Sequence, residues 1–199
     1  SNDPNVQMLV NKINYQLDNY GTTIDADNEM NLFNGNDEIV DSFQNDLING
    51  KIDGVIFYGV NPVYSMSNGS DISEAISKID FSLSFSEFMD ETASVCKFVC
   101  PDHNYLESWC DLNPGHNNYS LQQPLIRPLY NTRQSQESLL VWSGLAERSN
   151  SESQAFYDYM RKYWLDNSIG DQSSYPNFAD FWNWTIHTGY TTNNNESTL

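Results

Sequence analysis

Apolar residues recur every three or four positions in several stretches of the chain, and this spacing predicts amphipathic helices. The first runs from Asn5 to Tyr20, and Gly21 is expected to end it. The second runs from Asp37 to Asn49 and is followed by Gly50. The same spacing predicts further helices over Asp71–Lys78, Gln134–Arg148, Ser153–Leu165 and Asn177–His187.

The clearest strand signal is the continuous apolar run from Gly54 to Val60, which is typical of a strand buried on both faces of a parallel sheet. Strands are also predicted over Ile79–Phe85 and Val95–Val99, with a short helix or turn over Phe88–Ala93. The helix between the first two strands makes a strand–helix–strand unit with a right-handed crossover. The predicted fold class is therefore α/β: a Rossmann-like three-layer segment with a mostly parallel sheet and C-terminal helices.

From Asp102 to Arg133 the periodicity gives way to polar residues interrupted by prolines. This pattern predicts a long loop, which is either functional or ordered by something packed against it. The tail from Thr191 to Leu199 is polar and is expected to be mobile. We therefore divide the chain into an N-terminal helix with a polar loop (1–35), an α/β domain (36–150), and aromatic-rich helices with a tail (151–199).

Composition narrows the possible partners. The 199 residues include 27 acidic and 9 basic side chains, giving a formal net charge of −18. A surface of this charge repels phosphate backbones and anionic lipid headgroups, so we expect no nucleic-acid partner. No apolar run approaches the roughly 20 residues that cross a bilayer, so no direct membrane insertion is expected, and the polar start does not resemble a signal peptide.

The three cysteines and one nearby histidine are a conceivable metal set: Cys96, Cys100, His103 and Cys110. Their spacing matches neither a zinc knuckle nor an iron–sulfur cluster motif. Small buried thiols are common in cores, so we predict no metal site. One disulfide with a leftover thiol stays open as an alternative.

The polar segment also carries potential acid–base groups in Asp102, His103 and Glu107, with Ser108 as a conceivable nucleophile. No Gly-x-Ser-x-Gly sequence surrounds Ser108, and we predict no catalytic residue. Glu107, Trp109 and Arg127 are better interpreted as residues that fix the loop, with the arginine holding a carboxylate and the tryptophan closing the edge of the core.

Four motifs in order give the chain a family resemblance between Ile52 and Gly144. They are Gly59-Val60-Asn61-Pro62, Glu91-Thr92-Ala93, the segment from Pro101 to Asp111, and the segment from Gln123 to Tyr130. This order resembles the molybdopterin oxidoreductase superfamily, and most narrowly the large iron–sulfur subunit of alternative complex III, a bacterial quinol-oxidising assembly.

The resemblance implies a possible cofactor-binding set. In active members the Gly-x-Asn-Pro turn approaches the guanine nucleotide end of the cofactor, so Gly59, Asn61 and Pro62 would face it, together with Glu91 and Thr92. The chain departs from the family pattern at positions 96–97, where Cys-Lys replaces Ala-Asp, and at position 100, where a cysteine precedes the proline. These departures count against nucleotide binding.

The resemblance therefore implies a non-catalytic scaffold segment of an oxidoreductase-like subunit. It implies no cofactor in this segment, iron–sulfur clusters elsewhere in the parent protein, and other subunits or domains of a membrane-bound respiratory complex as partners. It also implies a location on the periplasmic side of the bacterial inner membrane. The alternative is a segment that binds molybdopterin guanine dinucleotide in an active oxidoreductase. A third hypothesis is a free-standing acidic binding module that uses surface Tyr and Trp residues.

Overall fold

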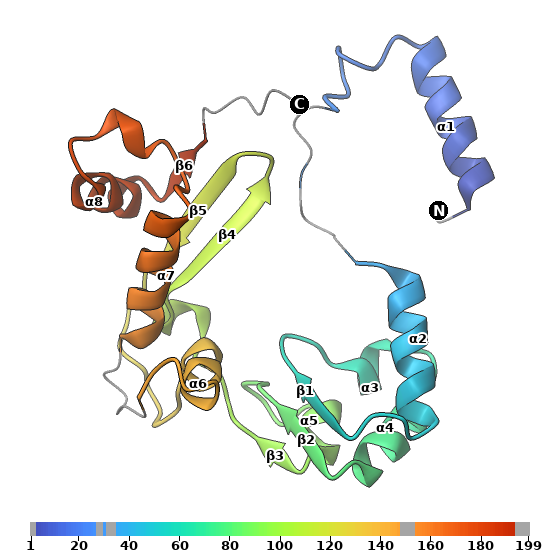
Figure 1. The fold of residues 1–199 in the computed structure, drawn as a ribbon. Helices are drawn as coiled ribbons and strands as arrows, with labels where there is room; N and C mark the ends of the chain where they lie inside the picture. The colour runs from blue at the N-terminus through green and yellow to red at the C-terminus, as the bar shows by residue number, and fades with distance from the viewer. Residues whose placement is uncertain (1–2, 27–29, 31–34, 148–153, 194–199) are drawn as a thin grey trace.

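The computed structural model describes residues 3–26, 30, 35–147 and 154–193 (Figure 1). Its described elements form two separate three-stranded sheets with helices around them. In chain order they are α1 Pro4–Gln16, α2 Asp37–Ile48, β1 Gly54–Phe57, α3 Pro62–Ser65, α4 Gly69–Lys78, β2 Phe81–Ser84, α5 Glu91–Val95, β3 Phe98–Val99, the 3-10 helix η1 Tyr105–Glu107, β4 Cys110–Gly115, β5 Asn118–Gln122, α6 Ser135–Trp142, α7 Ala155–Asp166, the 3-10 helix η2 Gln172–Ser174, α8 Phe178–Thr188 and β6 Tyr190–Thr192.

The first sheet has the order β1-β2-β3 and all its pairs are parallel. Gly54 pairs with Phe81 at the start of the register, and Phe57 pairs with Ser84 at its end. The predicted strand–helix–strand unit is therefore confirmed, with α4 between β1 and β2. Helix α4 begins at Gly69, two residues before its predicted start at Asp71, which lies in its first turn.

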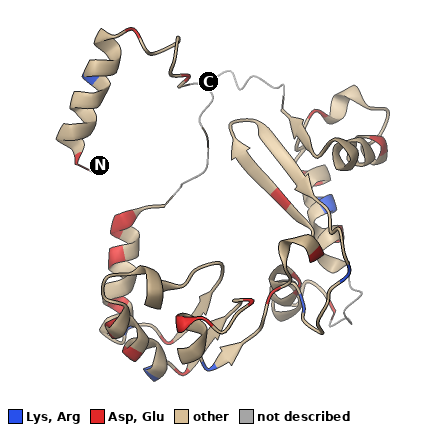
Figure 2. Ribbon diagram, turned by 180° about the vertical axis from the view of Figure 1, so that it is seen from behind, with Lys and Arg blue, Asp and Glu red and all other residues tan. Residues whose placement is uncertain are grey.

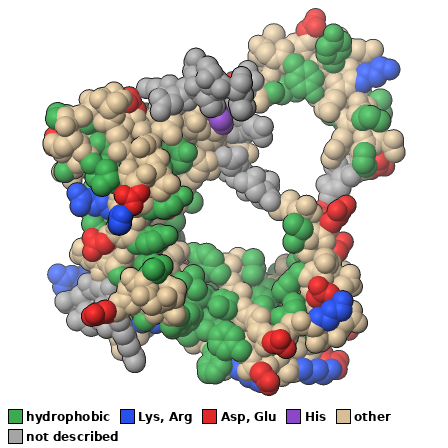
Figure 3. All heavy atoms as spheres, in the orientation of Figure 1, with side chains coloured by type: hydrophobic (Ala, Val, Ile, Leu, Met, Phe, Trp, Pro, Cys, Tyr) green, Lys and Arg blue, Asp and Glu red, His purple; other side chains and the backbone are tan. Residues whose placement is uncertain are grey.

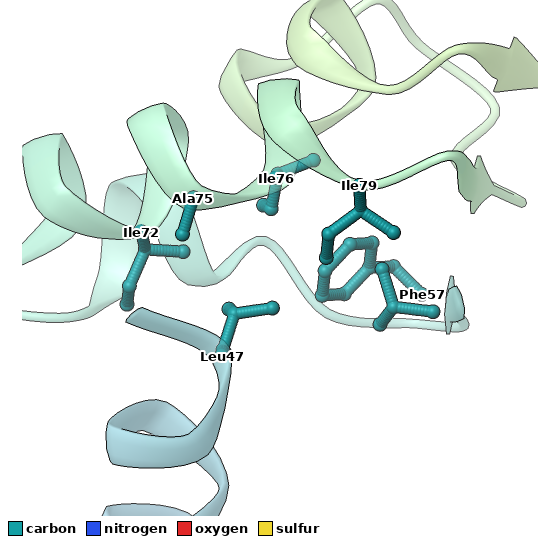
Figure 4. Close-up of a cluster of buried hydrophobic side chains, with 7 residues drawn as sticks. Leu47, Phe57, Ile72, Ala75, Ile76 and Ile79 are labelled. Carbon is teal, nitrogen blue, oxygen red and sulfur yellow. The ribbon is translucent and has the colours of Figure 1, made fainter. Parts of the chain in front are cut away.

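The core of this unit lies between the sheet and the helices α2 and α4 (Figure 4). Val55 and Phe57 point from β1 toward the apolar face of α4, and Leu47 closes the cluster from α2. Asn36 fixes the start of α2, since its side-chain oxygen accepts hydrogen bonds from the backbone N–H groups of Glu38 and Ile39 at 3.0 and 3.3 Å.

The other face of the parallel sheet is only partly covered by the described residues, since Leu83, which pairs with Ile56, is buried at 3%. Ile56, Phe81 and Phe98 are exposed on it at 43%, 42% and 51%. In Figure 3, hydrophobic side chains gather at the bottom of the view, where Figure 1 places β2 and β3. The expectation of a strand buried on both faces is therefore wrong in this structure, and the three-layer Rossmann-like arrangement is not confirmed.

The segment 102–133 is not the single long loop we predicted, because β4 and β5 form an antiparallel hairpin within it. Strand β6 pairs with β5 and completes a second, antiparallel sheet. The sequence hides the hairpin because Pro114 interrupts the strand pattern, and the ladder accommodates it with a register shift between Leu112 and Gly115. Asn117 takes φ = +57° in the tight turn.

The second core packs α7 and α8 against this hairpin. The buried side chains Met160, Trp164, Phe181 and Trp182 form its centre, with Tyr119 and Leu121 of β5 packed against them. The predicted helices α7 and α8 are therefore confirmed in type and position. Helix α6 is shorter than predicted and ends before Gly144, which takes φ = +76°; Arg148, its predicted end, lies outside the described residues.

Helix α1 is confirmed, but it ends at Gln16 rather than near Tyr20. It has no buried residue, and Figure 1 shows it apart from both sheets. None of the helices in the described part of the chain combines the length and apolar character needed to span a membrane. The predicted boundary between residues 35 and 36 lies one residue before α2, whereas the boundary between residues 150 and 151 lies outside the described residues.

Acidic side chains are spread along the described ribbon, on both sheet units (Figure 2). Lys51, Lys78, Lys97 and Lys162 each form an ion pair with a nearby carboxylate. All four pairs involve exposed side chains, so their net contribution to stability is small.

Candidate functional site

A cavity of about 540 Å³ lies at the carboxyl ends of the parallel strands. Its walls come from the turn after β1, the segment after β2, the segment around His103 and the start of α6. Ligands of open α/β sheets bind outside the carboxyl ends of the strands, so this cavity is the position where a site is expected.

Asn61 joins two of the sequence motifs beside this cavity. Its Nδ2 group donates a hydrogen bond to the Glu91 carboxylate at 2.7 Å. Its Oδ1 atom accepts from the Thr92 hydroxyl at 2.7 Å and from the Thr92 backbone N–H at 3.2 Å. The Thr92 hydroxyl oxygen in turn accepts from the backbone N–H of Val63 at 3.1 Å. We call these three side chains, Asn61, Glu91 and Thr92, the asparagine clamp.

The clamp determines what the motif residues can offer to a ligand. Gly59 and Asn61 line the cavity, and Gly59 takes φ = +63°, a conformation that favours glycine. Pro62 and Thr92 are buried, with Thr92 at 0% exposure. The structure thus brings Asn61, Glu91 and Thr92 together, but the side-chain hydrogen bonds described for them are to one another and to the backbone of α3 and α5.

The electrostatics of the cavity do not suit an anionic cofactor. Three carboxylates line it, from Glu87, Asp90 and Asp102, and its described lining residues include no lysine or arginine. A pyrophosphate group needs donors and positive charge around it. The residues present therefore do not fit molybdopterin guanine dinucleotide, and we derive no chemistry through it.

Asp102 attaches the start of α6 to the end of the parallel sheet. Its carboxylate accepts hydrogen bonds from the backbone N–H and the hydroxyl of Ser135, both at 2.7 Å. Gln136 of the same turn donates to the Tyr58 hydroxyl at 2.7 Å. These contacts could not be predicted from the sequence, because no local pattern pairs Asp102 with a residue 33 positions away.

Glu107 and Ser108, two of the potential acid–base and nucleophilic residues, form hydrogen bonds with backbone groups. Glu107 accepts hydrogen bonds from the backbone N–H groups of Asn104 and Leu129 at 3.2 and 3.0 Å. The Ser108 hydroxyl donates to the Asn104 carbonyl oxygen at 2.9 Å, and the residue is buried. His103 has a buried Nε2 atom without a hydrogen-bond partner among the described residues. No hydrogen bond joins His103 to Ser108 among the described contacts, so the arrangement lacks a base beside the nucleophile.

The loop-fixing interpretation is confirmed for two of its three residues. Glu107 ties η1 to the segment before α6, and Trp109 packs on the second core with its ring 4.6 Å from that of Tyr157. The prediction that Arg127 holds a carboxylate is wrong for the described residues, because none of their ion pairs involves Arg127.

The cysteines do not assemble into a metal centre within the described ranges. No three His, Cys, Asp or Glu side chains there are placed to hold an ion, and all three thiols are free. Burial, together with the Asp90 carboxylate, raises the pKa of the Cys96 thiol to about 11. Burial and the adjacent Asp111 also raise the pKa of Cys110.

The raised pKa of Cys96 predicts slow alkylation. Because the thiolate is the reactive form, the folded C100S/C110S variant should react with iodoacetamide at pH 8 roughly a hundredfold more slowly than an ordinary thiol. Its rate should keep rising by about tenfold per pH unit up to pH 11. The same variant in concentrated guanidinium chloride is the control, and its profile should level off near the ordinary thiol pKa. Matching folded and unfolded pH profiles would contradict the prediction.

Comparison with known proteins shows that part of this chain is similar to part of one curated protein. Over 94 residues the chain is 33% identical to the menaquinone reductase, molybdopterin-binding-like subunit, of Nitratidesulfovibrio vulgaris. Part of this chain is related to that subunit. The match covers 45% of this chain but 14% of the relative, so the chain spans a small part of the relative's length. No protein-family model matches the chain. The relationship is thus molybdopterin oxidoreductase-like, and it does not single out alternative complex III.

Proposed function

We propose that the chain is a non-catalytic scaffold segment of a molybdopterin oxidoreductase-like iron–sulfur subunit in a respiratory complex that reacts with quinones. The observation that carries this proposal is the asparagine clamp. Asn61, Glu91 and Thr92, the side chains that would face a cofactor, are hydrogen-bonded to one another and hold the turns at the starts of α3 and α5 together. The acidic lining of the adjacent cavity supports the same proposal.

The related subunit supports the proposed context. Its name describes a molybdopterin-binding-like component of a menaquinone reductase. By analogy, the partners of this chain are other subunits or domains of a membrane-bound electron-transport complex, and its location is the periplasmic side of the inner membrane. Alternative complex III is the narrower form of this proposal. The exposed side chains of Ile56, Phe81 and Phe98 on the parallel sheet offer apolar surface for such contacts.

A nucleotide titration separates the scaffold from the cofactor-binding alternative. We expect guanosine diphosphate added to the purified chain to give no saturable heat by calorimetry, because the carboxylates of the cavity repel its phosphates. Saturable binding that is weakened by G59V would contradict the scaffold proposal and favour the alternative. A gene that encodes little beyond these residues would instead favour a free-standing binding module.

A further inference from the structure

A second cavity, of about 610 Å³, adjoins the first and shares His103, Trp109 and Gln134 with it. Arg127 and Arg133 both line it. We propose that this cavity binds a carboxylate, held by the guanidinium groups of Arg127 and Arg133. This inference goes beyond the scaffold proposal and does not depend on it.

The two arginines stand out in a chain with 9 basic residues and a net charge of −18. The described ion pairs engage lysines, and Arg161 lies over the ring of Phe178 at 5.6 Å. Arg127 and Arg133 have no ion-pair partner among the described residues, yet they line one cavity. Unpaired guanidinium groups in such an acidic protein are suited to an anion from outside the chain.

The carboxylates beside the arginines are already engaged elsewhere. Glu107 accepts from two backbone N–H groups, as described above. Glu137 is buried and accepts from the backbone N–H of Phe156 at 2.7 Å, at the first turn of α7. Both side chains are thus held by the backbone, and neither forms an ion pair with Arg127 or Arg133 in the described structure.

One hydrogen bond holds the Arg133 guanidinium in place at the cavity. Its Nε group donates to the Ser138 hydroxyl at 2.9 Å, which fixes the plane of the guanidinium. No other hydrogen bond of Arg133 is formed with the described residues, so its terminal amino groups can bind a ligand. A guanidinium fork binds carboxylates through two parallel hydrogen bonds.

The other walls favour a carboxylate that carries an apolar or aromatic group. Trp109, Tyr130 and Tyr157 line the cavity together with Pro124 and Pro128. Its volume is within the range of small-ligand pockets. The same chemistry is offered by a small aromatic acid and by the carboxyl end or an acidic side chain of a polypeptide.

The test uses the isotope-labelled chain and NMR titrations. One probe is 3-phenylpropionate, the second is N-acetyl-Gly-Gly-Phe with a free carboxyl group, and the neutral control is 3-phenylpropanamide. Both acids are expected to shift the Trp109 indole and arginine Nε–H signals saturably, while the amide does not. The acid that binds more tightly identifies the source of the carboxylate.

Two variants separate the site from general charge effects. R127Q/R133Q should weaken binding of the acids by at least about tenfold, since charge-assisted hydrogen bonds are lost. K162Q removes one positive charge from α7 outside the cavity and should leave binding unchanged. Arg127 is exposed, so R127Q alone keeps the fold and should also weaken binding. Equal binding of acid and amide, unchanged affinity in R127Q/R133Q, no saturation by either acid, or tighter binding of inorganic phosphate would overturn the proposal.

Discussion

Replacing Asn61 with alanine is expected to lower the free energy of unfolding by about 2–4 kcal/mol, because three hydrogen bonds are lost and Thr92 is left with unsatisfied buried groups. Asn61 connects the first turn of α3 with the first turn of α5 through the contacts to Glu91 and Thr92. Urea denaturation followed by circular dichroism measures the change.

The matched control for this substitution is N49A. Asn49 is exposed, and its side chain makes one local hydrogen bond, to the Asn45 carbonyl oxygen at 2.7 Å. Its replacement should change the free energy of unfolding by less than about 0.5 kcal/mol, as surface substitutions generally do. Equal effects of N61A and N49A would show that the clamp does not hold the two motif turns together.

Replacing Trp164 with alanine is expected to cost about 3–5 kcal/mol, the range for a fully buried tryptophan. Trp164 is 0% exposed and packs edge-on against Trp182, with ring centroids 5.5 Å apart. Its indole N–H also donates to the Asp111 carboxylate at 2.7 Å, which attaches α7 to β4. Denaturant titration of the purified variant measures the loss.

The W164F variant separates the contribution of the hydrogen bond from that of packing, and W184A is the control. W164F keeps an aromatic ring but removes the N–H donor, so it should cost less than W164A, with about 1–3 kcal/mol of that cost due to the unpaired carboxylate. Trp184 lies on α8 and is 42% exposed, and W184A should be the mildest of the three. A W184A variant as unstable as W164A would contradict this placement of the second core.

Helices were the most predictable part of the fold. The apolar stripes of α2, α7 and α8 repeat over two or more turns, and capping residues such as Asn36 and Asn177 mark where helices begin. These signals are local, so the sequence alone contains them. The end of α1 was less predictable, because none of its residues is buried and no packing selects helix over turn at its end.

The sheets show where local pattern fails. The apolar run of β1 predicts burial but cannot say whether a second layer of helices covers the sheet, and here Ile56 is exposed. The hairpin β4–β5 was missed because Pro114 is unusual in a strand and because its neighbours alternate weakly between apolar and polar. Pairing with β6, far along the chain, completes that sheet.

The sequence identified some residues of the candidate site through their motifs, but not the contacts between them. Gly59 and Asn61 were identified by resemblance, and the structure places both at the wall of the cavity. The contact between Asn61 and Thr92 joins residues 31 positions apart, and the Asp102–Ser135 contact spans 33. Such pairs depend on how the strands and helices are arranged in space, which the residues alone do not specify.

The most direct test of the scaffold proposal is the molybdenum and guanine nucleotide content of the native polypeptide that carries these residues. It should be purified under non-denaturing conditions and assayed by elemental analysis, with nucleotide released from the same sample. We expect neither molybdenum nor guanine nucleotide, because the clamp engages the motif side chains and the carboxylates of the cavity oppose an anionic cofactor. Stoichiometric amounts of both would contradict it.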